Sequence, residues 1–120
     1  MNTANLALRF SLELAALVGF GALAWSLTNG RWRIVAVILA LGVIMTLWGV
    51  FAVPGDPSRS GSAPVPVPGL ARLGLELTIL LGGGIAFYAA GHSPAGIALI
   101  ALVLLHYALS VDRLVWLFQQ

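Results

Sequence analysis

ALRFSLELAALVGFGALAW at residues 7–25 and LARLGLELTILLGGGIAFY at residues 70–88 are the stretches that decide the fold of this chain. Each is long and apolar enough to cross the hydrocarbon core of a bilayer, which takes about 20 residues of helix. Each nevertheless carries an arginine and, one helical turn later, a glutamate. The two stretches therefore predict a membrane bundle with charged groups inside it.

The same two stretches align without gaps, which indicates an internal repeat. Arg9 falls on Arg72 and Glu13 falls on Glu76. The glycines also coincide, Gly19 with Gly82 and Gly21 with Gly84. Leucine matches mean little in such a composition, but these coincidences favour duplication over convergence on membrane composition. Repeats of two spans each enter the membrane from the same side, so a pseudo-two-fold axis along the membrane normal is expected.

Turn signals divide the chain into four apolar segments. Thr28-Asn29-Gly30 ends one helix, and Ser93-Pro94 supplies a cap residue and a proline at the start of another. The predicted spans are residues 5–27, 31–53, 69–90 and 93–118. The predicted fold class is all-α membrane: four transmembrane helices forming two tandem helical hairpins in a single domain, 1–120. Repeat 1 covers 5–53 and repeat 2 covers 69–118.

The loop between the hairpins, residues 54–68, holds five of the six prolines. Its Pro-Val-Pro-Val-Pro stretch favours extended polyproline geometry. We expect a hinge between the hairpins, and a passive linker is the simpler interpretation.

Composition excludes several classes of protein. The chain is 60% hydrophobic and 8% charged, with a mean hydropathy of +1.00, whereas soluble domains carry about 25% charged residues. All six basic residues are arginines, and they do not cluster as nucleic-acid binding requires. Cysteine is absent, which excludes thiol chemistry and cysteine metal sites. No nucleic acid and no cofactor are expected.

The charges inside the spans are the first candidate site, an intramembrane ionic cluster. Charged residues within a span are rare and pair with something. Arginine before glutamate at i, i+4 is the less favourable order within one helix, which suggests partners on other helices. Arg9 is expected to meet Glu76, and Arg72 to meet Glu13. Two interpretations stay open: a buried ionic latch between the repeats, and protonatable carboxylates in the cavity of a transporter.

A polar stripe in the last segment is the second candidate site. His106, Ser110 and Arg113 follow one another at i, i+4 and i+7, on one helix face. A histidine hydrogen-bonded in the bundle interior and a proton relay are both compatible with this pattern. With only two histidines in the chain, no metal site is expected.

Three motifs carry a resemblance to a known family: LRFSLELAAL near the N-terminus, WGVFAVPGDPSR at 48–59, and ARLGLELTILLGGG from residue 71. The chain resembles the YrdB-like family of small bacterial membrane proteins of unknown function over nearly its whole length. The resemblance implies a bacterial inner-membrane protein with four spans and implies no activity. Much of the resemblance lies in the middle loop, which suggests that this loop is more than a linker.

No nucleotide-binding or hydrolase motif is found, so an enzyme is not expected. The first expectation is a non-enzymatic bundle module that self-assembles or binds a partner membrane protein or lipid. The alternative is a proton-coupled transporter of small molecules using Glu13 and Glu76. The first apolar helix is expected to be retained rather than cleaved. The arginine distribution favours cytoplasmic N- and C-termini.

Overall fold

The computed structural model describes residues 3–57 and 63–120, and in them the chain is all-α apart from one short pair of strands. The elements are α1 (Thr3–Ser26), α2 (Trp32–Val50), β1 (Phe51–Ala52), β2 (Val65–Pro66), α3 (Gly69–Ala89), α4 (Ser93–Ala108) and α5 (Val111–Phe118). Helices α1, α2 and α3 are each long and apolar enough to cross a membrane, and the bent pair α4 and α5 adds a fourth if it is one span. The expected all-α class is confirmed.

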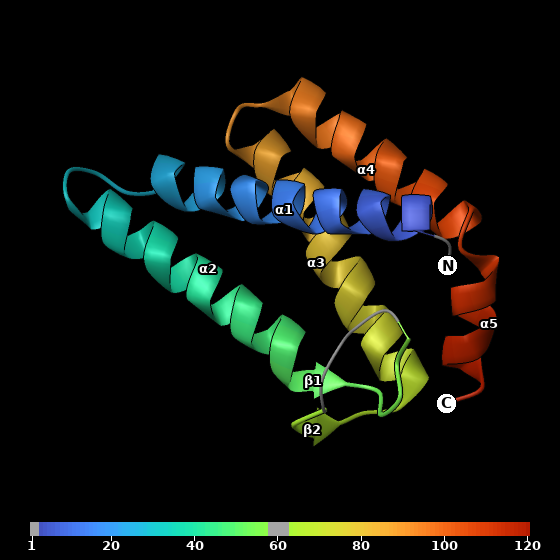
Figure 1. Cartoon of the computed structure of the whole chain (residues 1–120). Helices are drawn as coiled ribbons and strands as arrows, with labels where there is room; N and C mark the ends of the chain where they lie inside the picture. Colours follow the sequence, from blue (N-terminus) through green and yellow to red (C-terminus); the bar gives the residue numbers. More distant parts are fainter. Residues whose placement is uncertain (1–2, 58–62) are drawn as a thin grey trace.

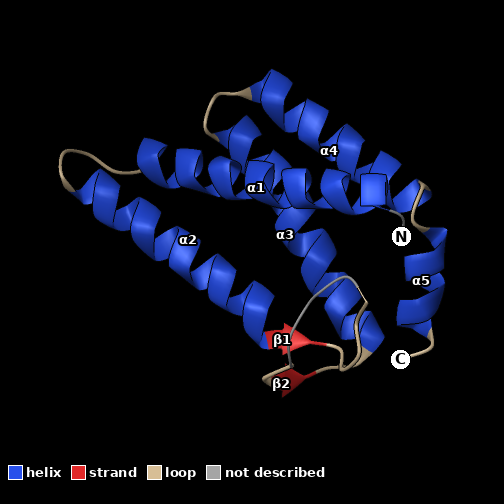
Figure 2. Cartoon of the chain, in the orientation of Figure 1, coloured by secondary structure: helices blue, strands red, loops and turns tan. Residues whose placement is uncertain are grey.

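Helices α1 and α3 cross at the centre of the molecule, with α2 beside α1 and α4 beside α3 (Figure 1). The tight turns that close the two hairpins lie at one end, and both use a glycine at positive φ, Gly30 and Gly91. The two chain ends, both strands and α5 lie at the other end (Figure 2). The buried apolar core between the helices includes Leu12, Ala16, Leu80, Leu99, Val103 and Tyr107.

Small residues allow the central crossing. A Cβ built at Gly83 meets the Cα of Ala16 at 2.5 Å, and one built at Gly19 meets the carbonyl oxygen of Gly83. One built at Gly82 meets the ring of Phe20 at 3.0 Å. Backbones that approach this closely need glycine on at least one side, as in other membrane helix pairs.

The remaining two glycines of the sequence repeat face their own hairpin partners. Gly21 packs against Val37 of α2, and Gly84 packs against Ile100 of α4. Val37 and Ile100 are themselves equivalent in the ungapped alignment of the two halves. Equivalent residues therefore make equivalent contacts in the two hairpins.

The last segment differs from the expected single span of 93–118. It breaks at Leu109 and Ser110, and α4 and α5 meet at an angle of 72°. The Ser110 hydroxyl donates to the carbonyl oxygen of His106 at 2.7 Å, a local bond that competes with regular helix geometry. Helix α4 alone has 16 residues, about 24 Å at 1.5 Å per residue, whereas α5 packs across the start of α3 (Figure 1).

The described part of the middle loop packs on the bundle. Strands β1 and β2 pair in parallel, and the main-chain N–H of Val67 donates to the carbonyl of Ala52 at 2.9 Å. Ala52 and Val53 are buried. The extended geometry expected near residues 64–68 is therefore used for pairing, while Arg59 lies outside the described residues.

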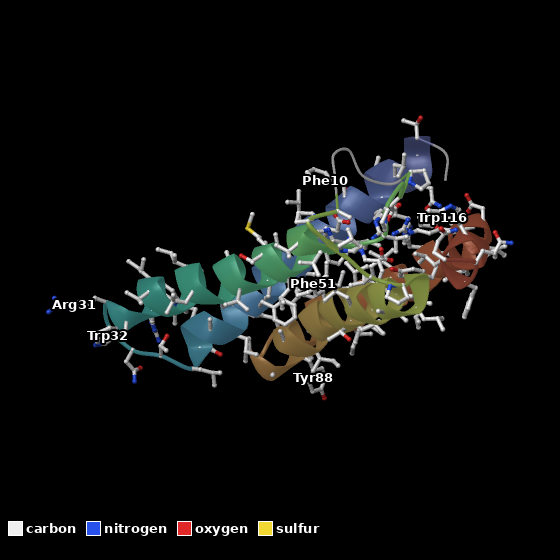
Figure 3. All side chains as sticks on the ribbon, turned by 90° about the horizontal axis from the view of Figure 1, so that it is seen from below. Phe10, Arg31, Trp32, Phe51, Tyr88 and Trp116 are labelled. Atoms are coloured by element: carbon white, nitrogen blue, oxygen red, sulfur yellow. The ribbon has the colours of Figure 1, made fainter. Side chains whose placement is uncertain are left out.

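Aromatic side chains mark both ends of the molecule. Trp32 and Tyr88 are exposed near the hairpin turns, and Trp116 lies at the opposite end (Figure 3). Such belts are typical of membrane–water interfaces.

Candidate functional site

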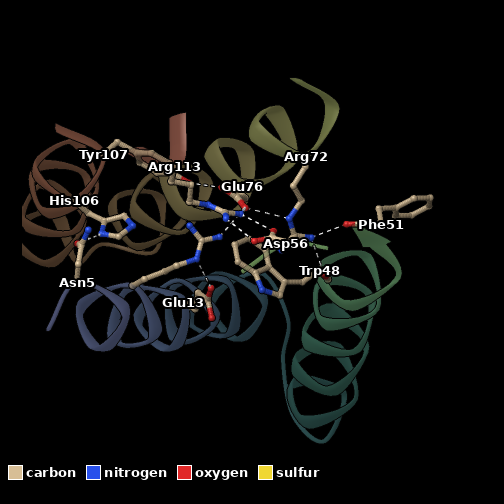
Figure 4. A network of polar contacts seen from close by, with 11 residues as sticks. Asn5, Glu13, Trp48, Phe51, Asp56, Arg72, Glu76, His106, Tyr107 and Arg113 are labelled. Carbon is tan, nitrogen blue, oxygen red and sulfur yellow. Dashed lines mark hydrogen bonds and ion pairs between the residues drawn. The ribbon is translucent and has the colours of Figure 1, made fainter. Parts of the chain in front are cut away.

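Glu76 of α3 is the centre of a buried cluster of charged groups (Figure 4). Its side chain has no solvent exposure. Its Oε1 accepts from Arg9 Nη2 at 2.8 Å, from Arg72 Nε at 3.1 Å and from Arg113 Nη2. The Tyr107 hydroxyl donates to Oε2 at 2.8 Å. One carboxylate thus joins α1, α3, α4 and α5, and both of its oxygens are engaged.

Arg72 connects this carboxylate to the end of α2. Its Nη1 donates to the carbonyl oxygens of Trp48 at 2.7 Å and Phe51 at 2.6 Å. The last carbonyls of a helix have no partner within the helix and carry the negative end of its dipole, so a guanidinium suits them. Arg72 also lies 4.7 Å from the centre of the Trp48 ring, and Arg9 lies 5.5 Å from it. Trp48 therefore packs against two of the arginines rather than serving only as an interfacial residue.

Arg113 of α5 connects the cluster to the middle loop. Its Nη1 and Nη2 donate to Asp56 Oδ1 and Oδ2 at 2.7 Å and 3.0 Å, a bidentate pair that suits the planar guanidinium. Asp56 and Arg113 are both buried. The bend before α5 brings Arg113 between the loop and Glu76, so this one side chain holds three segments together.

His106 and Ser110 form a separate hydrogen-bonded group with Asn5 of α1. His106 Nδ1 lies 2.9 Å from Asn5 Oδ1, and Asn5 Nδ2 donates to the Ser110 hydroxyl at 2.6 Å. Both His106 and Ser110 are fully buried. The predicted stripe is therefore divided: two members contact α1, and Arg113 belongs to the charged cluster.

Glu13 differs from Glu76 although the two are equivalent in sequence. Its side chain keeps 25% exposure, and its ion-pair partner is Arg9, whose Nε lies 3.2 Å from Oε1. The expected pair between Arg9 and Glu76 is present. The expected pair between Arg72 and Glu13 is absent from the ion pairs of residues 3–57 and 63–120, because Arg72 is directed to Glu76 and to the end of α2. The cluster is therefore asymmetric.

We call Arg9, Glu13, Asp56, Arg72, Glu76 and Arg113 the charged cluster. It contains three arginines and three carboxylates, so its formal charge is balanced. Donors are in excess: Arg9 Nη1 and Arg113 Nε are buried and have no hydrogen-bond partner within the described part of the chain. Within residues 3–57 and 63–120, no group of three or more His, Asp or Glu residues is arranged to hold a metal ion.

Three residues of the site were not predicted from the sequence: Asp56, Tyr107 and Asn5. Asp56 follows the Pro54-Gly55 turn in a proline-rich loop, where an acid is usually solvated. The available signal was Arg113, which has no acid at i±4 and so needs a distant partner. Tyr107 and Asn5 gave no signal, since their contacts depend on how the helices cross.

Long apolar helices closed around a buried cluster of charges place this chain in the class of helical, multi-pass membrane proteins. The chain belongs to the DUF2568 family, described as a protein of unknown function, whose model matches residues 7–104. It is 42% identical to the uncharacterized protein YrdB of Bacillus subtilis (strain 168), over 100% of this chain and 98% of that protein. No solved structure matches the chain. The family resemblance predicted from the motifs is confirmed.

Proposed function

We propose that this protein is a non-enzymatic membrane module whose charged cluster is an ionic latch between two helical hairpins. The observation that carries the proposal is the state of Glu76, which is fully buried and engaged on both oxygens by three arginines and a tyrosine. A carboxylate that must exchange protons with water needs an accessible face. Glu76 is instead enclosed by groups that hold it in place.

The hairpins are proposed to be a duplicated pair related by a pseudo-two-fold axis along the membrane normal, with four spans in total. The equivalent contacts of Gly21 with Val37 and of Gly84 with Ile100 support this arrangement. The latch then works across the repeat boundary, since Arg9 of the first hairpin pairs with Glu76 of the second.

The module is proposed to sit in the bacterial cell (inner) membrane and to self-assemble or bind a membrane partner or lipid. Support comes from α2, which has no buried residue and presents large apolar side chains along its outer side. Both termini are proposed to be cytoplasmic. Support comes from the number of arginines in the sequence, four on the side of the chain ends and the middle loop against two on the side of the hairpin turns.

Replacing each glutamate in turn tests the latch. Glu76→Gln leaves buried arginines without their carboxylate and is expected to cost about 3–5 kcal/mol of unfolding free energy, as for other broken buried pairs. Glu13→Gln removes a partly exposed ion pair and is expected to cost about 1 kcal/mol or less. Thermal unfolding of both purified variants in detergent measures the difference, and Glu13→Gln is the matched control. Equal melting temperatures for Glu76→Gln and the wild type would contradict the latch.

A second candidate function, a proton-coupled transporter of small molecules, has one observation in its favour. Glu13 is only partly buried and engages one arginine. Glu76, the other carboxylate first considered for this role, is enclosed. Proton flux into vesicles that contain the folded wild type or the folded Glu13→Gln variant separates the candidates, because a transporter predicts a flux that Glu13→Gln abolishes and a latch predicts no flux in either.

A further inference from the structure

Helix α5 presents three different faces to its surroundings. Arg113 and Leu117, four residues apart, are buried against the bundle. Val111, Val115 and Phe118 follow one another at i, i+4 and i+7, so they share a second face, and they are 58%, 50% and 64% exposed. We call these three residues the apolar face of α5. The helix is packed on one side and leaves a stripe of large apolar side chains on another.

The third face of α5 is polar. Asp112 lies in the first turn and Gln119 directly follows the helix, seven positions later, so the two lie on the same side. Both are exposed, and we call them the polar face. Trp116, which is half-buried, lies at this end of the molecule (Figure 3). A polar face beside an exposed apolar face suits a helix with water on one side and hydrocarbon on the other.

The length of α4 places α5 near the edge of the hydrocarbon core. Helix α4 begins just after the hairpin turn at Gly91 and has 16 residues, about 24 Å at 1.5 Å per residue. The core of a typical bilayer is about 30 Å thick. A span of this length that starts at one boundary is therefore still about 6 Å short of the other boundary where the chain bends into α5.

The contact between α5 and α3 gives the same level independently. Gly69 is the first residue of α3, and a Cβ built there meets the carbonyl carbon of Leu117 at 2.6 Å. Helix α3 has 21 residues, about 32 Å at the same rise. Its other end lies at the hairpin turn from which α4 starts (Figure 1). The first residue of α3 is therefore at the far boundary of the core, and α5 lies across it.

The bend sets the direction of α5. The helix has 8 residues, about 12 Å. Because it lies at 72° to α4, it advances by only about 4 Å along the axis of α4. Helix α5 therefore runs mainly along the membrane surface rather than through the bilayer.

From the faces, the helix lengths and the bend, we infer that α5 is an interfacial helix whose apolar face is an interaction surface for lipid acyl chains just below the headgroups. The polar face remains in water, and α4 alone is the fourth span. The one basic residue of α5, Arg113, is buried, so the attraction is hydrophobic and does not require anionic lipid. The inference rests on the proposed membrane location of the module and not on the ionic latch.

Spin labels on the two faces test the inference, and the chain has no cysteine that would interfere. Val115→Cys on the apolar face and Gln119→Cys on the polar face are each labelled with a nitroxide in the full chain, in phosphatidylcholine nanodiscs. Electron paramagnetic resonance then measures collisions with oxygen, which concentrates in lipid, and with a water-soluble nickel chelate. The ratio of oxygen to nickel collisions is expected to be about tenfold higher at position 115 than at position 119, with the label at 115 about 5–10 Å below the headgroups.

Two further labels calibrate the depth. Leu39→Cys lies near the middle of α2, at a residue that is 63% exposed, and Asn29→Cys lies in an exposed hairpin turn. They are expected to report the bilayer centre and water. Val111→Cys repeats the measurement on the apolar face. Replacing half of the phosphatidylcholine by phosphatidylglycerol is expected to leave the depth at 115 unchanged, because no basic side chain of α5 is exposed.

Several outcomes overturn the inference. A label at 115 as deep as the label at 39 shows that α5 continues the span. Collisions at 115 mainly with the nickel chelate show that the apolar face lies in water, and few collisions with either reagent show that protein covers it. A depth that changes with phosphatidylglycerol shows that charge positions the helix. If the label at 39 also fails to meet lipid, the proposed membrane location is wrong, which distinguishes that failure from a failure of the interfacial helix alone.

Discussion

Glu76 and Glu13 occupy matching places in the two halves of the sequence, yet their surroundings differ in the number of arginines and in exposure. Part of the difference comes from Arg72, which is directed to Glu76 and to the end of α2 rather than to Glu13, and part comes from two residues outside the repeat motif. Arg113 reaches Glu76 from α5, and Tyr107 reaches it from α4. At the scale of residues, two helices with similar sequences therefore hold their glutamates differently: Glu76 is buried among three arginines, and Glu13 is partly exposed beside one.

Tyr107→Phe tests how much one neutral donor contributes to this cluster. The change removes a hydrogen bond to a buried carboxylate and keeps the ring, so we expect a loss of about 1.5–3 kcal/mol, the range for hydrogen bonds to charged groups. Tyr88→Phe is the matched control because Tyr88 is 60% exposed. Thermal unfolding in detergent gives both values. A loss in Tyr88→Phe as large as in Tyr107→Phe would argue against a specific role for the bond to Glu76.

At the scale of elements, the crossing of α1 and α3 depends on close approaches at glycine, of which that between Gly83 and Ala16 is the one to test. A Cβ at Gly83 meets the backbone of Ala16, which cannot move aside as a flexible side chain can. We expect Gly83→Ala to destabilise the protein by about 1–3 kcal/mol, the usual cost of overpacking. Gly42→Ala, with open space around it, is expected to be neutral or slightly stabilising. The melting temperatures of the two variants measure this difference. Identical values would show that α1 and α3 move apart at no cost in stability.

Much of the helical arrangement was predictable from the sequence. Apolar length, turn residues and the charged repeat gave α1, α2 and α3 within a few residues, and they gave the contact between Arg9 and Glu76. The break at Ser110 was not predictable, because the hydrophobic pattern continues through it and the cause is a set of contacts with Asn5 and His106. Asp56 was missed for a similar reason: its partner is 57 residues away in the chain.

At the scale of the whole molecule, both chain ends lie opposite the two hairpin turns (Figure 1). Cysteine labelling tests the proposed orientation directly, since the chain has no cysteine of its own. With cytoplasmic termini, Gln119→Cys in intact cells is expected to be protected from a membrane-impermeant maleimide, and Asn29→Cys is expected to react. Both positions are exposed at opposite ends of the molecule. The reverse labelling pattern would invert the orientation, and labelling of both from outside would contradict the predicted topology.

Arg113 is made long after the carboxylates that it joins. Asp56 precedes it by 57 residues and Glu76 by 37. During biosynthesis, both acids are therefore translated before the arginine that they share. Glu76 has Arg9 and Arg72 to pair with in that interval, whereas the buried ion pair of Asp56 that the structure describes is with Arg113. The bidentate contact between Asp56 and Arg113 is therefore expected to form only after α5 has been synthesised.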